Sequence, residues 1–149
     1  MPQFARPSAD TNNPGSYTDQ AGGSASLFAT IDESAANDAD FIRSPTDPVN
    51  AVYVTKLTSL TDPVSSAGHI LRARVSTDVA SGGNALDYTD ELRQGYVNEG
   101  SLGTLIATLS QAGVSGTTWQ DLAYTLSAAE ADAITDYTAL YRRIKFHKP

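Results

Sequence analysis

The stretch AVYVTKLTSL, residues 51–60, decides the fold class of this chain. It is rich in β-branched and aromatic residues, which suit a pleated, partly buried strand. Its side chains alternate between two faces: Val52 and Val54 lie on one, and Tyr53 and Leu57 lie on the other. This period of two predicts a β-strand.

Similar alternating segments follow along the chain. After the turn signal TDPVSSAG, the segment HILRARVSTD alternates Leu71 and Val75 with Arg72 and Arg74, so the arginines mark a face toward solvent or a partner. Further strands are predicted in SLFATIDES (26–34), ALDYTDEL (85–92), SLGTLIATL (101–109), TTWQDLAYTL (117–126) and TALYRRIKF (138–146). Short strands at such regular spacing predict an all-β fold, an antiparallel jelly-roll-like β-sandwich.

Length, charge and composition narrow the classes of protein. A chain of 149 residues is the size of one domain. Its net charge of -7 would repel a polyphosphate backbone, so we expect no nucleic-acid partner. The chain has no cysteine and no apolar run long enough to cross a bilayer. We therefore expect folding in a reducing cytoplasm and no membrane partner.

One short helix is predicted near the C-terminus. Ser127 precedes AAEADAI with Glu130 three residues later, which is the spacing of a capping box. The acids Glu130 and Asp132 lie in the first turns, where the helix dipole favours negative charge. Structure alone therefore accounts for these acids.

The C-terminal strand carries a concentration of positive charge. Residues 142–149 hold four of the ten Lys and Arg residues of an acidic chain. Tyr141, Arg143 and Lys145 share the predicted outer face of this strand, and Arg142 lies beside them in sequence. We predict that these four residues dock a partner.

The N-terminal segment, residues 1–24, is predicted to be an extended arm outside a sandwich domain of residues 25–149. It is mostly Pro, Ser, Asn, Gly, Asp and Thr, with Phe4 and Tyr17 as its only large apolar residues, so it cannot build its own core. We expect the arm to be tied down against its own domain or a neighbouring subunit. Phe4, Arg6 and Tyr17 are its candidate docking residues, and its deletion is expected to leave a folded domain.

The segment IDESAANDADFI, residues 31–42, is the one candidate metal site. Asp32, Glu33, Asp38 and Asp40 fall close together, and calcium prefers several oxygen ligands. However, the EF-hand register with its central Gly is absent, and Asp and Asn also dominate turns. The turn interpretation is favoured, and no metal or cofactor is predicted.

No catalytic motif stands out. His69 and His147 lie far apart in sequence, and neither HExxH nor GxSxG occurs. Trp119, the single tryptophan, is expected in the core because of the large area that it buries, and the alternative is a sugar-binding groove. We therefore predict a protein that is not an enzyme. Burial is predicted for six apolar residues: Ile31, Leu71, Leu126, Ile134, Leu140 and Ile144.

Several motifs together resemble a family of small proteins encoded among phage and prophage structural genes. They are RPSAD (6–10), LFATIDES with NDADFI, TDPVSSAGHILRARV and TLSAAEADAITDYTALYRRIKF, and they span nearly the whole chain. The chain departs from the family pattern at Phe41, where Tyr is usual, and in the arm, where Tyr17 stands near the place of a usual Trp. The matching positions are Ile31, Asp32, Glu33, Asp38, Asp40, Ile42, Asp62, Pro63, Gly68, His69, Arg72, Arg74, Ile134, Asp136, Tyr137 and Leu140.

The resemblance implies a structural protein of the virion with a jelly-roll-like sandwich. The expected role is decoration of the capsid surface, with the major capsid protein and copies of itself, as in a trimer, for partners. The alternative is a tail, collar or fibre component, for example a glycan-binding host-recognition module. An enzyme such as a glycan depolymerase is a third possibility, which lacks an acid and base pair in the sequence.

Overall fold

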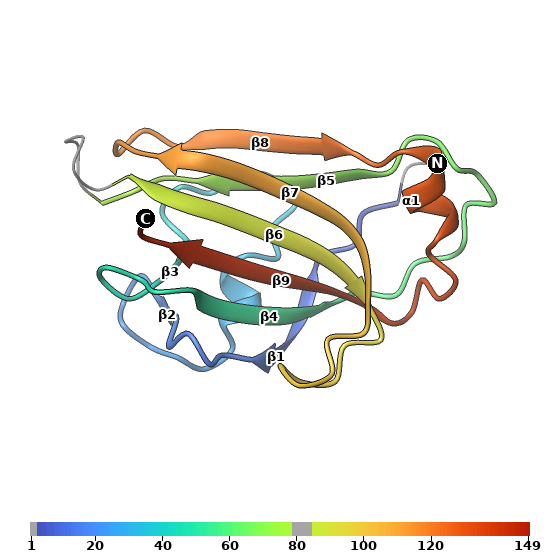
Figure 1. Ribbon diagram of the computed structural model, residues 1–149. Coiled ribbons are helices and arrows are strands. Elements are labelled where there is room, and N and C mark those ends of the chain that lie inside the picture. The colour runs from blue at the N-terminus through green and yellow to red at the C-terminus, as the bar shows by residue number, and fades with distance from the viewer. Residues whose placement is uncertain (1–2, 79–84) are drawn as a thin grey trace.

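The chain forms an antiparallel β-sandwich, which confirms the predicted all-β fold class (Figure 1). The structure is a computed structural model that describes residues 3–78 and 85–149. Its elements in chain order are β1 (Pro7–Asn12), β2 (Thr18–Asp19), the 3-10 helix η1 (Leu27–Thr30), β3 (Ile42–Arg43), β4 (Ala51–Leu57), β5 (Ile70–Val75), β6 (Leu86–Gln94), β7 (Thr104–Val114), β8 (Gln120–Thr125), the helix α1 (Ala128–Asp132) and β9 (Leu140–His147).

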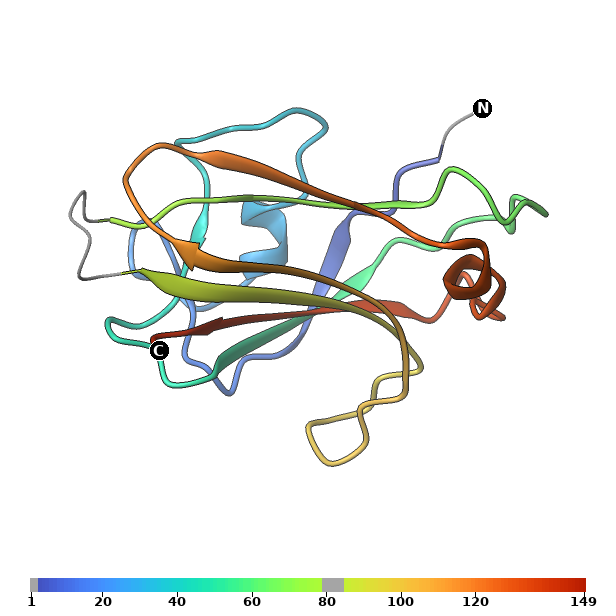
Figure 2. The same ribbon diagram turned by 45° about the horizontal axis from the view of Figure 1, so that its top comes forward.

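One large sheet opposes two small ones. The large sheet has five antiparallel strands in the order β1-β4-β9-β6-β7. Strand β5 pairs with β8, and β2 pairs with β3, as two separate antiparallel ribbons. The pair β5 and β8 runs as its own layer beside the large sheet (Figure 2). Side chains from the large sheet, from β5 and from the N-terminal segment share one hydrophobic core.

Strand β4 is buried on both faces, which explains its high apolar content. Tyr53 and Leu57 belong to the core between the layers. On the opposite face, Val52 and Val54 form a second apolar cluster with Tyr96. Tyr96 belongs to the connection between β6 and β7, so this connection covers the outer face of the sheet. The alternation predicted for β4 therefore holds, with apolar packing on each side.

The N-terminal segment is tied to its own domain. Strand β1 pairs with β4 at the edge of the large sheet, and the Thr55 hydroxyl donates a 2.9 Å hydrogen bond to the carbonyl of Ala9. Tyr17 is 1% exposed, and its hydroxyl donates to the Ala51 carbonyl at 3.1 Å. The N-terminal segment, which was predicted to lie outside the sandwich, therefore completes it through β1 and Tyr17.

The strand predicted at residues 26–34 is wrong, because η1 forms there. The carboxylate of Asp10 accepts the backbone N–H groups of Leu27 and Phe28 at 2.9 and 2.8 Å. These N–H groups open the helical turn and need an acceptor, which Asp10 supplies from strand β1. The same carboxylate accepts the Tyr53 hydroxyl at 2.6 Å, so it joins η1, β1 and β4.

The predicted helix near the C-terminus is confirmed with its capping box. The Ser127 hydroxyl accepts the N–H of Glu130, and the Glu130 carboxylate accepts the N–H of Ser127 at 2.7 Å. The N–H and the hydroxyl of Ser127 both donate to the Glu130 carboxylate, and these two hydrogen bonds lower its pKa. Five of the six predicted core residues are buried, and Ile31 is half-buried against the core.

Candidate functional site

Strand β9 divides its basic side chains between the two faces of the large sheet. Arg142 lies on the inner face, where its guanidinium is ion-paired with Asp90 of β6. Asp90 is fully buried and also accepts the Tyr88 hydroxyl at 3.2 Å. Burial, followed by the nearby charge of Asp90, raises the pKa of Tyr88 well above its usual value.

The assignment of Arg142 as a docking residue is therefore wrong. A buried carboxylate needs a close counter-charge and hydrogen bonds to remain ionised. Arg142 supplies both from the inner face of β9, on the same side as Leu140 and Ile144. Its guanidinium stabilises the sandwich and is not available as a free positive charge on the surface.

Arg143 lies on the outer face and is also neutralised within the chain. Its guanidinium contacts Glu99 at 2.6 Å and Glu91 at 3.4 Å. The hydrogen bonds from Arg143 hold the pKa of the Glu99 carboxyl below its usual value. Arg93, two residues from Glu91 on β6, contacts the Glu91 carboxylate at 2.6 Å. These charges form a short network on the outer face. Beside this network, the ring of Tyr141 packs against the ring of Tyr96, with centroids 5.8 Å apart.

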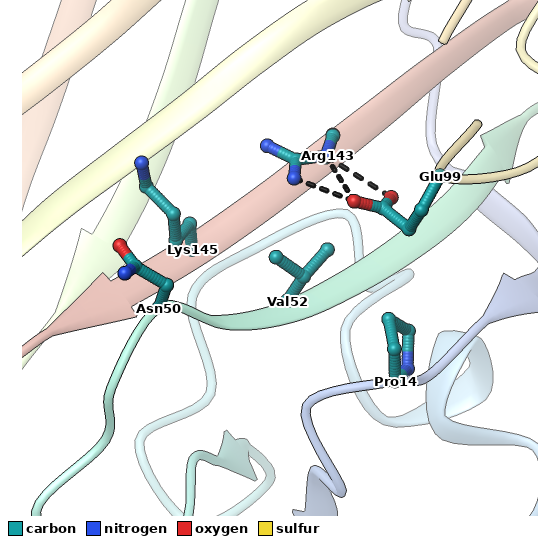
Figure 3. Close-up of a pocket in the computed structure, with 6 residues that line it drawn as sticks. All are labelled: Pro14, Asn50, Val52, Glu99, Arg143 and Lys145. Carbon is teal, nitrogen blue, oxygen red and sulfur yellow. Dashed lines mark hydrogen bonds and ion pairs between the residues drawn. The ribbon is translucent and has the colours of Figure 1, made fainter. Parts of the chain in front are cut away.

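Lys145 differs from its basic neighbours because no acid of the described chain pairs with it. It is half-buried at a shallow depression of about 310 Å³ on the outer face of β4 and β9 (Figure 3). The depression is lined by Pro14, Asn50, Val52, Glu99, Arg143 and Lys145. In Figure 3 the side chain of Lys145 lies beside Asn50, apart from the dashed contacts that join Arg143 to Glu99.

The docking residues predicted in the arm have different surroundings. Phe4 is 67% exposed, and the guanidinium of Arg6 lies 5.7 Å from the centroid of its ring. Arg6 also donates to the backbone carbonyl of Asp32 at 3.3 Å, which anchors the arm. Tyr17 is buried in the core, so its assignment to a docking surface is wrong. Its ring contacts Tyr53, where an apolar residue of the arm closes the sandwich.

The acidic segment at residues 31–42 does not bring its four candidate calcium ligands, Asp32, Glu33, Asp38 and Asp40, together in one site. Asp38 forms a two-point contact with Arg74, at 2.6 and 2.8 Å, which lowers the pKa of its carboxyl. Burial, with the neighbouring carboxyl of Asp40, raises the pKa of Glu33. Within residues 3–78 and 85–149, no group of three or more His, Asp or Glu side chains is placed to hold a metal ion.

A wide groove borders this acidic segment. It has a volume of about 840 Å³ and runs between residues 31–48 and strand β5, over the inner face of the large sheet. Trp119 and Phe41 lie at its wall with ring centroids 5.6 Å apart. The guanidinium of Arg74 lies 6.0 Å from the Trp119 ring. The core position expected for Trp119 is therefore wrong: its side chain is half-buried at the groove wall.

Sequence reasoning did not locate this groove, although some of its residues attracted notice. The alternation of its strand predicts an outward face for Arg74, and the sequence offers Asp38 as a turn residue or a cation ligand. Their contact joins segments 36 residues apart in sequence. The sequence shows Arg74 within an alternating strand and Asp38 within a turn. Neither pattern indicates that the two side chains form an ion pair with each other.

The two histidines lie in different elements and have different surroundings. The Nε2 atom of His69 lies 2.9 Å from the Tyr137 hydroxyl, and His147 lies at the end of β9.

No helix among the described residues is both long enough and apolar enough to span a membrane. Comparisons with protein-family models, with curated proteins and with solved structures found no match for this chain.

Proposed function

We propose that this protein is a non-enzymatic structural protein of a bacteriophage particle that decorates the outer surface of the assembled head. A decoration protein of this kind binds the completed lattice and not the free subunits, so it stabilises the shell by mass action. The motif resemblance along nearly the whole chain supports this role, and the sandwich with its built-in N-terminal strand supplies a rigid body. The major capsid protein and further copies of this chain, as in a trimer, are the proposed partners.

The half-buried Lys145 is the observation that carries this proposal. An ammonium group held at a depression without an acidic partner is a preformed contact for a carboxylate of another protein. Arg143 and Glu99 beside it are already paired, so they hold the wall of the depression in place. The net charge of -7 argues against nucleic acid as the binding partner.

Attachment to particles that lack the protein tests this role. Lys145→Glu is expected to weaken binding to such particles, and wild-type binding is expected to fall as salt is raised. Lys56→Glu is the matched control. Lys56 also lies on the outer face of the sheet, on β4 opposite Tyr141, and away from the depression. Equal binding by wild type and Lys145→Glu would reject this docking site.

A second candidate function is a glycan-binding component of the tail, collar or fibre. The pair Trp119 and Phe41 favours it, because aromatic faces at a groove can pack against sugar rings. The carboxylates and guanidinium groups at the groove could bind hydroxyls. This function predicts binding on a glycan array that Trp119→Ala abolishes.

A further inference from the structure

The groove separates the two small ribbons of the sandwich. Ile42 and Arg43 of β3 line one side of it, and residues 72–78, which include four of the 6 residues of β5, line the other. The large sheet has five strands, whereas the layer opposite it consists of β2 with β3 and of β5 with β8. We propose that the groove accepts an extended segment of a partner polypeptide, which adds as a strand along the free edge of β5.

The hydrogen-bond pattern of β5 identifies the groups that would bind this strand. The N–H of Leu126 donates to the carbonyl of His69 at 2.9 Å. Antiparallel pairing alternates, so Leu71, Ala73 and Val75 also direct their backbone groups toward β8. The backbone groups of the intervening residues therefore point away from β8. These residues are Ile70, Arg72 and Arg74.

These edge groups have no hydrogen-bond partner in the part of the chain that the structure describes, since β5 pairs only with β8 there. An unpaired edge is the feature that strand addition uses, because the N–H and C=O groups of a guest segment satisfy it. A saccharide lacks the regular spacing of donors and acceptors that matches a strand edge. The edge therefore favours a polypeptide as the occupant.

The size of the groove fits a short strand. A strand residue occupies roughly 160 Å³ when the spacings along the strand, between strands and between sheets are multiplied. The groove volume of about 840 Å³ thus holds on the order of five residues. Strand β5 itself has 6 residues, so the bound segment and the free edge of β5 match in length.

The floor of the groove offers apolar surface to such a guest. Ile31, Ile42, Ala73 and Phe146 line the groove, and each remains only partly buried against the core. Alternate side chains of a strand would point to this floor. Burying the exposed part of these residues would favour binding through the hydrophobic effect.

The outer rim sets the charge that the guest should carry. The ion pair between Arg74 and Asp38 joins the two walls, and it is exposed, so solvent screens it and a bound strand can displace it at little cost. Arg72 is exposed at the same wall and has no ion-pair partner among the described residues. The guest is therefore an extended segment with alternating apolar residues and an acidic residue that meets Arg72.

A proline at the edge tests the proposal on the isolated protein. Arg72→Pro removes an N–H that points away from β8, which an edge strand tolerates. Arg72→Ala is the matched control, because it removes the same guanidinium and retains the N–H. The probe is a displayed library of random 12-residue peptides, from which binders of the wild-type protein are selected.

We expect selected peptides to have alternating apolar residues and to slow amide hydrogen exchange at Arg72 and Arg74. We expect Arg72→Pro to bind them about tenfold more weakly than Arg72→Ala, which corresponds to one lost hydrogen bond. The exchange measurement uses the wild-type chain, so it remains decisive if the proline variant does not fold.

Two results would overturn the proposal: peptides that leave both amides unprotected, or equal binding by the two variants. A glycan that binds the groove with dependence on Trp119, when no peptide does, would also reject it and favour a saccharide site. The biological partner rests on the proposed function, whereas peptide binding does not. Loss of peptide binding and absence from virions are therefore separate failures.

Discussion

Replacing Asp90 by Asn should destabilise the protein strongly. The change keeps the shape of the side chain but removes the charge that pairs with Arg142 inside the sandwich. Breaking a buried ion pair on one side costs about 3 to 5 kcal/mol, because the remaining charge stays uncompensated. The side chain of Arg142 is 16% exposed at the floor of the groove, so residual hydration places the expected loss near the lower limit, about 3 kcal/mol.

The free energy of unfolding measured by urea denaturation checks this value. For a chain of this size, a loss of about 3 kcal/mol also lowers the melting temperature by roughly 6 to 12 °C. The double variant Asp90→Leu with Arg142→Met should recover most of the loss, since an apolar pair of similar volume can replace a buried ion pair. Asp38→Asn is the control at an exposed, solvent-screened pair, where the loss of stability should be much smaller than for Asp90→Asn. A loss below about 1 kcal/mol for Asp90→Asn would refute the structural role of Arg142.

Three further predictions concern the stability of the sandwich. Arg143 lowers the pKa of the Glu99 carboxyl in the folded state. The pair therefore stabilises the fold fully above the pKa of the unfolded carboxyl, about 4.3, and this stability is lost as the pH falls through the pKa of the folded state. The variant Glu99→Gln should therefore lose less stability than wild type in denaturation between about pH 5 and pH 3, and an unchanged pH dependence would contradict this. Leu126→Ala should cost about 2 to 5 kcal/mol in urea denaturation because Leu126 is 5% exposed in the core, and a cost near zero would reject its assigned packing. Deletion of residues 1–24 should abolish cooperative unfolding by circular dichroism, because it removes β1 and the buried Tyr17, and a cooperative, folded variant would contradict the role of the arm in the sheet.

Local patterns in the sequence predicted most of the strands and the helix. The alternation at residues 51–60 marks β4, and Ser127 with Glu130 marks the start of α1, because both signals act over a few neighbouring residues. The prediction failed at residues 26–34, where the deciding contact is the carboxylate of Asp10 from another strand. A tertiary cap of this kind leaves no trace in the local period.

The candidate site was harder to predict, for the same reason. The alternation of β9 places Arg142 on the face of Leu140 and Ile144, yet its charge and its neighbours in sequence led to its assignment as a docking residue. Only the position of Asp90 on the inner face of β6 explains how this charge is buried. The groove depends on how the two ribbons lie relative to each other, which no single segment of the chain encodes.

The number of copies of this chain in purified particles of the phage that encodes it tests the proposed role most directly. Quantitative mass spectrometry would measure it against the major capsid protein. Decoration of the head predicts a copy number comparable to that of the major capsid protein. A far smaller number would contradict decoration and favour a tail, collar or fibre position, and absence from the particles would contradict a structural role in the virion.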